Sequence, residues 1–256
     1  LQLIDVSEHT WRWEGVVHNY LDLLSGDEKQ EPLPDVWIVY HAMQGAKSHG
    51  VTAEEKFLRD AVMLEAELAK NPNDARSQFY LGQSYMDAGH YEKAYTAYKK
   101  RAAMKNTWDE EKFYSLTMAG VIAETLGMPE DVIVGDLLAA FGTKPTRAEP
   151  LYYLASYFNS ANKYEKAYSY AVVGSRMSTP RRNLDGSVPL FLHHDIYDWR
   201  LLDELCVSAY YVGKLEEGRS ACEEILLKAE SKSVRIPERD VERTKSALTY
   251  YLAKMT

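Results

Sequence analysis

The feature that most constrains the fold is a block of sequence that recurs along the chain. The block from Leu81 to Tyr98 matches the block from Leu154 to Ala171 with a shift of 73 residues, which is about two periods of a shorter repeat. Two further copies fall in phase, one around Gly120 and one around Cys206. This periodicity predicts a series of helix pairs, each of which buries its apolar face only against its neighbours.

The residue types at fixed places in the copies indicate how each pair packs. Small residues mark the point of closest helix approach, where only a small side chain fits: Gly82, Gly120, Ala155 and Cys206. Aromatic residues are expected to fill the space between neighbours: Tyr85, Tyr91, Phe158 and Tyr164. Residues that tolerate positive φ are expected to end the first helix of each pair: Gly89, Gly127, Gly213 and Asn162. Prolines stand at repeat boundaries or open a second helix: Pro72, Pro145 and Pro129.

This pattern resembles the tetratricopeptide repeat, a helix-turn-helix of about 34 residues. The resemblance implies a mostly α fold, a right-handed superhelix of α-α pairs with a short β-containing segment in front of it. The expected elements are a β-containing segment at 1–51, a lead-in helix at 52–70, repeats at about 75–108, 112–146, 148–180 and 199–229, and a capping helix at 237–255. We expect the capping helix to bury Val241, Leu248, Tyr251, Leu252 and Met255.

Two cysteines, Cys206 and Cys222, are the only ones in the chain. No Cys-x-x-Cys pair is present, so neither a zinc cage nor a disulfide framework is indicated. Both cysteines fall on core positions of the last copy, which predicts a packing role. No metal site is expected; the adjacent His193, His194 and Asp195 are poorly placed to face one centre.

Charge and hydropathy exclude several classes of function. The formal net charge of -8 argues against generic binding to nucleic acid. No apolar run approaches the ~20 residues of a membrane-spanning helix, so no transmembrane segment is expected. The first residues lack the basic flank and apolar core of a signal peptide, which makes the cytoplasm the default location.

Residues 1–51 lack the repeat pattern and are richer in residues that favour strands. The stretches 1–6 and 36–40 read as strands, and Trp11–Leu21, "WRWEGVVHNYL", is rich in aromatic and β-branched residues. Together with the first helix, this segment resembles the end of the catalytic domain of family 2 glycosyltransferases that carry a tetratricopeptide tail. The matching positions are Trp13, Gly15, Val17, His18, Leu21, His41, Arg59, Asp60, Leu64 and Glu65.

The resemblance implies sugar transfer from a nucleotide sugar by the full family enzyme, with a divalent metal as its cofactor. It suggests His18, Asn19 and His41 as family site positions, although the family has Glu where this chain has Asn19. An amide cannot take up a proton as a carboxylate can. The sequence also contains no Asp-x-Asp motif. We therefore expect no cofactor in this chain and no catalysis by this chain alone.

Three hypotheses follow for the function. The first is the C-terminal region of a family 2 glycosyltransferase, whose repeats position an acceptor or a partner. The alternative is a stand-alone tetratricopeptide adaptor that mediates protein-protein interaction, with residues 1–51 capping the first helix. The third is a complete transferase that needs another chain to supply the nucleotide pocket.

Recognition is expected in a concave groove lined by the first helices, which suits a peptide, a protein or a glycan acceptor. The groove candidates are Arg76, Phe79, Gln83, Met86, Tyr114, Thr117, Glu124, Glu149, Tyr152, Ser156 and Asn159. The non-helical stretch 178–198 adds loop candidates: Arg181, Arg182, His193, His194 and Asp195. Exposed repeat ends also make self-association an open alternative.

Overall fold

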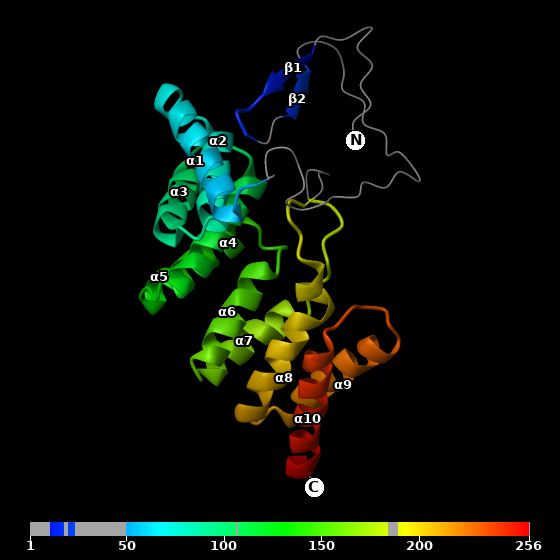
Figure 1. The fold of residues 1–256 in the computed structure, drawn as a ribbon. Coiled ribbons are helices and arrows are strands. Elements are labelled where there is room, and N and C mark those ends of the chain that lie inside the picture. The colour runs from blue at the N-terminus through cyan, green and yellow to red at the C-terminus, as the bar shows by residue number, and fades with distance from the viewer. Residues whose placement is uncertain (1–10, 18–19, 24–49, 106, 184–188, 256) are drawn as a thin grey trace. The chain divides into compact units, whose positions relative to one another are not determined.

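The computed structural model describes residues 11–17, 20–23, 50–105, 107–183 and 189–255 (Figure 1). The chain forms two compact units, residues 1–105 and 106–256. The expected strands at 1–6 and 36–40, and the family positions His18, Asn19 and His41, lie outside the described residues.

The described part of unit 1 contains a pair of antiparallel strands and three helices. Strand β1 (Trp11–Glu14) pairs antiparallel with β2 (Tyr20–Leu23). The helices are α1 (Ala53–Lys70), α2 (Ala75–Asp87) and α3 (Tyr91–Ala103), and α2 packs against both α1 and α3. Helix α1 therefore precedes the first complete pair, α2–α3. Among the described residues no helix comes before it with which it could form a pair of its own.

Local sequence explains where α1 begins. The Thr52 hydroxyl accepts a hydrogen bond from the Glu55 N–H at 3.1 Å, and the Glu55 carboxylate accepts one from the Thr52 N–H at 2.8 Å. This reciprocal capping box satisfies two backbone donors that a helix start otherwise leaves open. On the opposite side of the solvated face, Ala61, Leu64 and Leu68 are buried.

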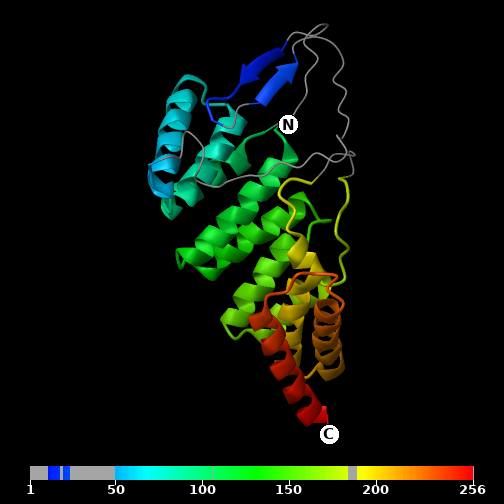
Figure 2. The same ribbon diagram turned by 45° about the vertical axis from the view of Figure 1, so that its right-hand side comes forward.

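Unit 2 continues the helix pairs. Its elements are α4 (Asp109–Thr125), α5 (Glu130–Thr143), α6 (Glu149–Ser160), α7 (Tyr164–Gly174), a π-helical turn η1 (Ile196–Arg200), α8 (Leu201–Tyr211), α9 (Leu215–Glu230) and α10 (Glu238–Met255). The pairs α4–α5, α6–α7 and α8–α9 stack in sequence order, and α10 packs on α8 and α9 (Figure 2). The first helices α4, α6, α8 and α10 also contact one another in turn.

The predicted points of close approach are confirmed. A Cβ added to Gly82 would lie 2.7 Å from Cδ1 of Tyr98, and one added to Gly120 would lie 2.5 Å from Cγ of Leu137. The predicted helix ends are also confirmed, since Gly89, Gly127 and Gly213 have φ values of 77°, 64° and 75°. Asn162, the expected substitute, has a φ of 56°.

Three sequence predictions need correction. Tyr91 is 38% exposed and Leu252 is 48% exposed, so neither fills the core. Helical structure also begins inside the segment expected to be a loop up to residue 198, because Ile196 and Trp199 are buried one turn apart in η1. Two apolar residues in a five-residue turn are too few to show a helical period in the sequence, and the nearby Pro189 favours a loop.

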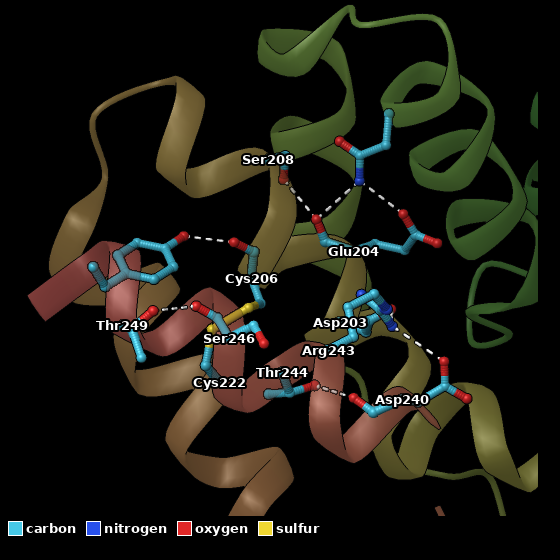
Figure 3. Close-up of a disulfide and its surroundings, with 12 residues drawn as sticks. Asp203, Glu204, Cys206, Ser208, Cys222, Asp240, Arg243, Thr244, Ser246 and Thr249 are labelled. Atoms are coloured by element: carbon cyan, nitrogen blue, oxygen red, sulfur yellow. Dashed lines mark hydrogen bonds and ion pairs between the residues drawn. A yellow bond between two sulfur atoms is a disulfide. The ribbon is translucent and has the colours of Figure 1, made fainter. Parts of the chain in front are cut away.

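The two cysteines are in the core, as predicted, but they form a disulfide, which the sequence reasoning did not expect (Figure 3). Cys206 of α8 and Cys222 of α9 lie 5.5 Å apart at Cα, across the same contact at which Gly82 faces Tyr98 in the first repeat. Two side chains of intermediate size therefore replace a small and a large one. The Tyr251 hydroxyl of α10 donates to the Cys206 carbonyl at 2.5 Å.

Candidate functional site

The predicted groove residues divide between the two units. Arg76, Phe79, Gln83 and Met86 lie on α2 in unit 1, and the others lie on α4 and α6 in unit 2 or at their ends. Phe79 is a core residue, only 1% exposed. Arg76 donates to the Tyr80 hydroxyl at 3.3 Å, and Gln83 and Met86 are half-buried.

In unit 2 we define the first-helix face as the side formed by α4, α6, η1 with α8, and α10. At its α4 end lies a buried ionic cluster. Arg147, 1% exposed, donates through Nε and Nη2 to the carboxylate of Glu149, with the shortest contact at 2.7 Å. Its Nη1 donates to Glu110 Oε2 at 3.0 Å, and Lys144 forms an ion pair with Glu110 at 2.9 Å.

The same cluster holds the end of the loop that precedes α8. The Leu190 N–H donates to Glu110 Oε2 at 2.7 Å, and Arg147 Nη2 donates to the Leu190 carbonyl at 3.1 Å. The next residue, Phe191, has a φ of 46° and places its ring centroid 4.9 Å from that of Tyr114. Glu149 is therefore engaged within the fold, and Tyr114 is covered in part by Phe191.

Tyr197 of η1 closes the cluster from a further side. Its hydroxyl donates to Glu149 Oε2 at 2.7 Å and accepts a hydrogen bond from the Ala148 N–H at 3.0 Å. Burial raises the pKa of Tyr197, and the charge of Glu149 raises it further. The tyrosine thus stays protonated and serves as a fixed donor at physiological pH.

The middle of the first-helix face combines aromatic and charged groups. Arg200 donates from Nη1 to the Tyr152 hydroxyl at 3.2 Å and forms an ion pair with Asp195 at 2.7 Å. Burial raises the pKa of Tyr152, although Arg200 opposes the shift. Asp195 is thus the loop candidate that the structure brings to this face.

A polar row continues toward α10 (Figure 3). Asn159 Nδ2 donates to the carbonyl and to Oε2 of Glu204, at 3.0 and 2.7 Å. Arg243 of α10 donates to Asp203 Oδ2 at 2.7 Å. Burial raises the pKa of the Glu204 carboxyl, and the neighbouring amide of Asn159 opposes that shift.

Two acceptor oxygens in this row are left over. Asn159 Oδ1 and Asp203 Oδ1 are screened from water and have no hydrogen-bond partner among the described residues. A buried acceptor without a donor costs free energy on the order of 1–3 kcal/mol. The row therefore contains two acceptors that no donor of the described residues uses.

The remaining candidates occupy varied settings. Thr117 is buried, and its hydroxyl donates to the Phe113 carbonyl at 2.9 Å. Burial raises the pKa of half-buried Glu124. Ser156 is half-buried, and the exposed loop candidates are Arg181, Arg182, His193 and His194. No group of three or more His, Cys, Asp or Glu in the described part of the chain is arranged to hold a metal ion.

Sequence reasoning missed Arg200, Asp203 and Glu204, yet a signal for two of them exists. The fourth copy aligns with the first at a shift of 124 residues, Gly82 to Cys206. The same shift carries the groove candidates Arg76 and Phe79 onto Arg200 and Asp203. Arg147 and Glu110 lie outside the repeated block, so the repeat alone gives no signal for their ion pair.

The fold is an α-helical repeat of the tetratricopeptide type, and solved structures support that fold. MamA superposes with a TM-score of 0.55 at 17% identity, over 76% of this chain and 99% of that chain. BtubC from P. vanneervenii gives 0.54 at 14% identity, over 81% of this chain and 83% of that chain. A chain of the APC/C hetero-tetramer Cut9–Hcn1 gives 0.52 at 15% identity, over 79% of this chain but only 34% of that chain.

At these identities the likeness shows the fold alone. No protein-family model matches the sequence, and the search of curated proteins finds no match. None of these comparisons supports the resemblance of residues 1–51 to a glycosyltransferase. In the described part of the chain, every helix is too short or too polar to cross a membrane.

Proposed function

We propose that this chain is a protein-binding scaffold that holds an extended segment of a partner against the first-helix face of unit 2. The observation that carries the proposal is the pair of unpartnered acceptors, Asn159 Oδ1 and Asp203 Oδ1, on the neighbouring helices α6 and α8. Backbone N–H groups or basic side chains of a partner supply the donors that these two atoms lack.

The charges of the face favour the same kind of partner. Across the middle of the first-helix face and the polar row, four carboxyl groups, those of Asp195, Asp203, Glu204 and Asp240, outnumber the two guanidinium groups of Arg200 and Arg243. Tyr152 adds an aromatic surface beside them. A partner segment fits this face when its amide or cationic donors meet the carboxyl groups and an adjacent aliphatic or aromatic residue packs on Tyr152.

The likeness to solved structures is consistent with a protein partner. One of the similar structures is the APC/C hetero-tetramer Cut9–Hcn1, so the matching chain was solved in a complex with another protein. A tetratricopeptide adaptor is accordingly the reading that we favour over a glycosyltransferase tail.

The glycosyltransferase hypothesis rests mainly on residues 1–51 together with the first helix, up to Glu65, and is tested separately. The reading frame upstream of Leu1 should encode alternating strands and helices with an Asp-x-Asp motif if the hypothesis holds. A start codon directly before Leu1 contradicts it.

The scaffold proposal is tested with a displayed library of random 12-residue peptides, panned on the purified chain. The affinity of the best synthetic peptide is then measured by fluorescence anisotropy. Asn159→Ala and Asp203→Asn should each weaken binding by about tenfold or more, because each removes an acceptor. Ser169→Ala, on exposed α7, should leave the affinity unchanged. Peptides that bind both acceptor variants as tightly as the wild type would contradict the proposal.

A further inference from the structure

A second surface lies in unit 1, in a groove between α1 and α3 whose floor is α2. The groove has a volume of about 620 Å³. Leu81 and Gln78 of α2 form its floor, and Leu68 of α1 makes the adjoining wall apolar. Its edges carry Glu65 on α1 and Glu92, Lys93 and Lys100 on α3.

Gln78 is the residue that departs from the repeat. The positions equivalent to it in the three later copies are all leucine: Leu116, Leu151 and Leu202. All three leucines are buried, with exposures of 8%, 3% and 8%, and Gln78 is 2% exposed. The first repeat therefore places an amide where the others place an aliphatic side chain.

The amide of Gln78 is only half satisfied. Its Nε2 donates to the Ala97 carbonyl at 3.2 Å, whereas its Oε1 is buried without a hydrogen-bond partner among the described residues. Leucine would avoid the cost of burying this acceptor. The terminal torsion of a glutamine is broad, and Oε1 reaches a donor placed in the groove when the amide turns about this torsion and gives up its bond to Ala97.

The charges of this groove also differ from those of its counterpart between α5 and α7, which has a volume of about 630 Å³. Lys93 and Lys166 are equivalent, and each ammonium lies 5.0 Å from the aromatic centroid below it, that of Tyr85 or Phe158. Lys166 forms an ion pair with Glu130 of the facing helix at 2.8 Å.

In the α1–α3 groove the carboxylate on the facing helix is Glu65, and it bonds a tyrosine rather than the lysine. Glu65 accepts a hydrogen bond from the Tyr85 hydroxyl at 2.5 Å. Burial raises the pKa of Tyr85 to about 12, and Glu65 contributes to the shift, so the tyrosine remains a donor. The α3 edge carries Lys93 and Lys100, two helical turns apart, together with Glu92, so it presents two ammonium groups and one carboxylate toward the groove.

We propose that the α1–α3 groove binds an amphipathic helix of a partner protein. The apolar face of this helix packs on Leu68 and Leu81, one Asn, Gln or Ser side chain donates to Gln78 Oε1, and acidic residues face Lys93 and Lys100. Two helices already form the walls, and the side chains along one face of a third helix enter the groove between them. This surface is separate from the first-helix face of unit 2.

The test uses a displayed library of 18-residue amphipathic helix sequences, panned on the full chain with Gln78→Leu as the counter-selection target. Affinities of the enriched peptides are measured by fluorescence anisotropy, and stability is measured by thermal unfolding. Gln78→Leu should weaken binding at least tenfold and raise the unfolding midpoint by about 2–4 °C, because it restores the leucine of the other repeats.

Charge variants provide the matched control. Lys93→Glu should weaken the selected peptides at least fivefold, whereas Lys166→Glu, at the equivalent position of the other groove, should not. Asn159→Ala should also leave these peptides unaffected, which separates this result from the test of the scaffold proposal. Equal binding to wild type and Gln78→Leu, equal effects of the two lysine variants, or no enrichment over the counter-selection target would overturn the proposal.

Discussion

At the scale of single residues, space at one helix contact explains much of the sequence. Gly82 leaves room for the buried ring of Tyr98, and Gly120 leaves room for Leu137. In the last pair, Cys206 and Cys222 occupy the same contact and are bonded to each other. The contact tolerates different pairs of side chains as long as their joint volume is conserved.

Gly82→Ala should therefore be destabilising. Its Cβ would lie 2.7 Å from a ring atom of Tyr98, whose side chain is fully buried and has no room to retreat. We expect a loss of about 1–3 kcal/mol in the free energy of unfolding, measured by urea denaturation. Gly135→Ala is the matched control, because a Cβ there meets no atom within 4 Å. It should stabilise α5 by about 0.5–1 kcal/mol; a loss of stability at both glycines would contradict the volume argument.

Glu204 should make stability depend on pH. Burial raises the pKa of its carboxyl in the folded state, so the folded chain favours the protonated form. The stability linked to this group is fully present below the ordinary pKa of a glutamate and is lost as pH rises through the raised value. Glu204→Gln should thus gain stability relative to wild type between pH 4 and pH 7 in parallel urea titrations. A constant difference between the two proteins would show that Glu204 titrates normally.

Local features of single residues were predictable from sequence, and partners distant in sequence were not. Positive φ at Gly89 and Asn162 follows from the residue types themselves. The exposure of Tyr91 depends on which neighbours pack around it, and the periodic pattern does not specify them. The unpartnered oxygens of Asn159 and Asp203 are visible only once α6 and α8 lie side by side.

At the scale of elements, the ionic cluster ties three parts of unit 2 together. Glu110 opens α4, Arg147 and Glu149 stand at the start of α6, and Leu190 belongs to the loop before η1. The three charged side chains are between 0% and 2% exposed. A buried ion pair adds little net stability compared with apolar residues, but breaking it leaves charges without partners.

Arg147→Ala should accordingly be among the most damaging single changes. It leaves Glu110 and Glu149 buried without their guanidinium partner, and it releases the Leu190 carbonyl. We expect a loss of about 3–5 kcal/mol in the free energy of unfolding. Lys245→Ala, which removes an exposed ion pair with Glu242, should not change the unfolding midpoint. Equal effects of the two substitutions would mean that the cluster is not buried in solution.

At the scale of the whole molecule, the described helices form pairs, and within unit 2 each pair also contacts the next pair along the chain. The order and boundaries of the pairs were predictable, because each repeat carries its own pattern of small and aromatic residues. The function of residues 1–51 was not, because short strands define no fold by themselves. The comparisons support the helical-repeat fold and do not support the resemblance to a glycosyltransferase.

Residues 106–256 should fold without the rest of the chain. They form one of the two compact units and contain three complete helix pairs with α10 packed on the last pair. A fragment that spans these residues should give a helical circular dichroism spectrum and a single cooperative thermal transition. A matched fragment that ends at Gly174 lacks the last pair and exposes the α7 face that packs on α8, so it should be less stable. A helix-poor spectrum of the longer fragment would contradict the division into units.

The covalent link between α8 and α9 has a mechanical consequence. It closes a loop around the turn of a single helix pair, with 16 positions separating the two sulfur-bearing residues. When force is applied to the two ends of the chain, the segment inside that loop cannot be drawn out while the bond is intact. At ~3.4 Å per residue, the fully extended oxidised chain is shorter than the reduced one by roughly 50 Å. The tension on the chain then runs through sulfur rather than through the backbone of the turn.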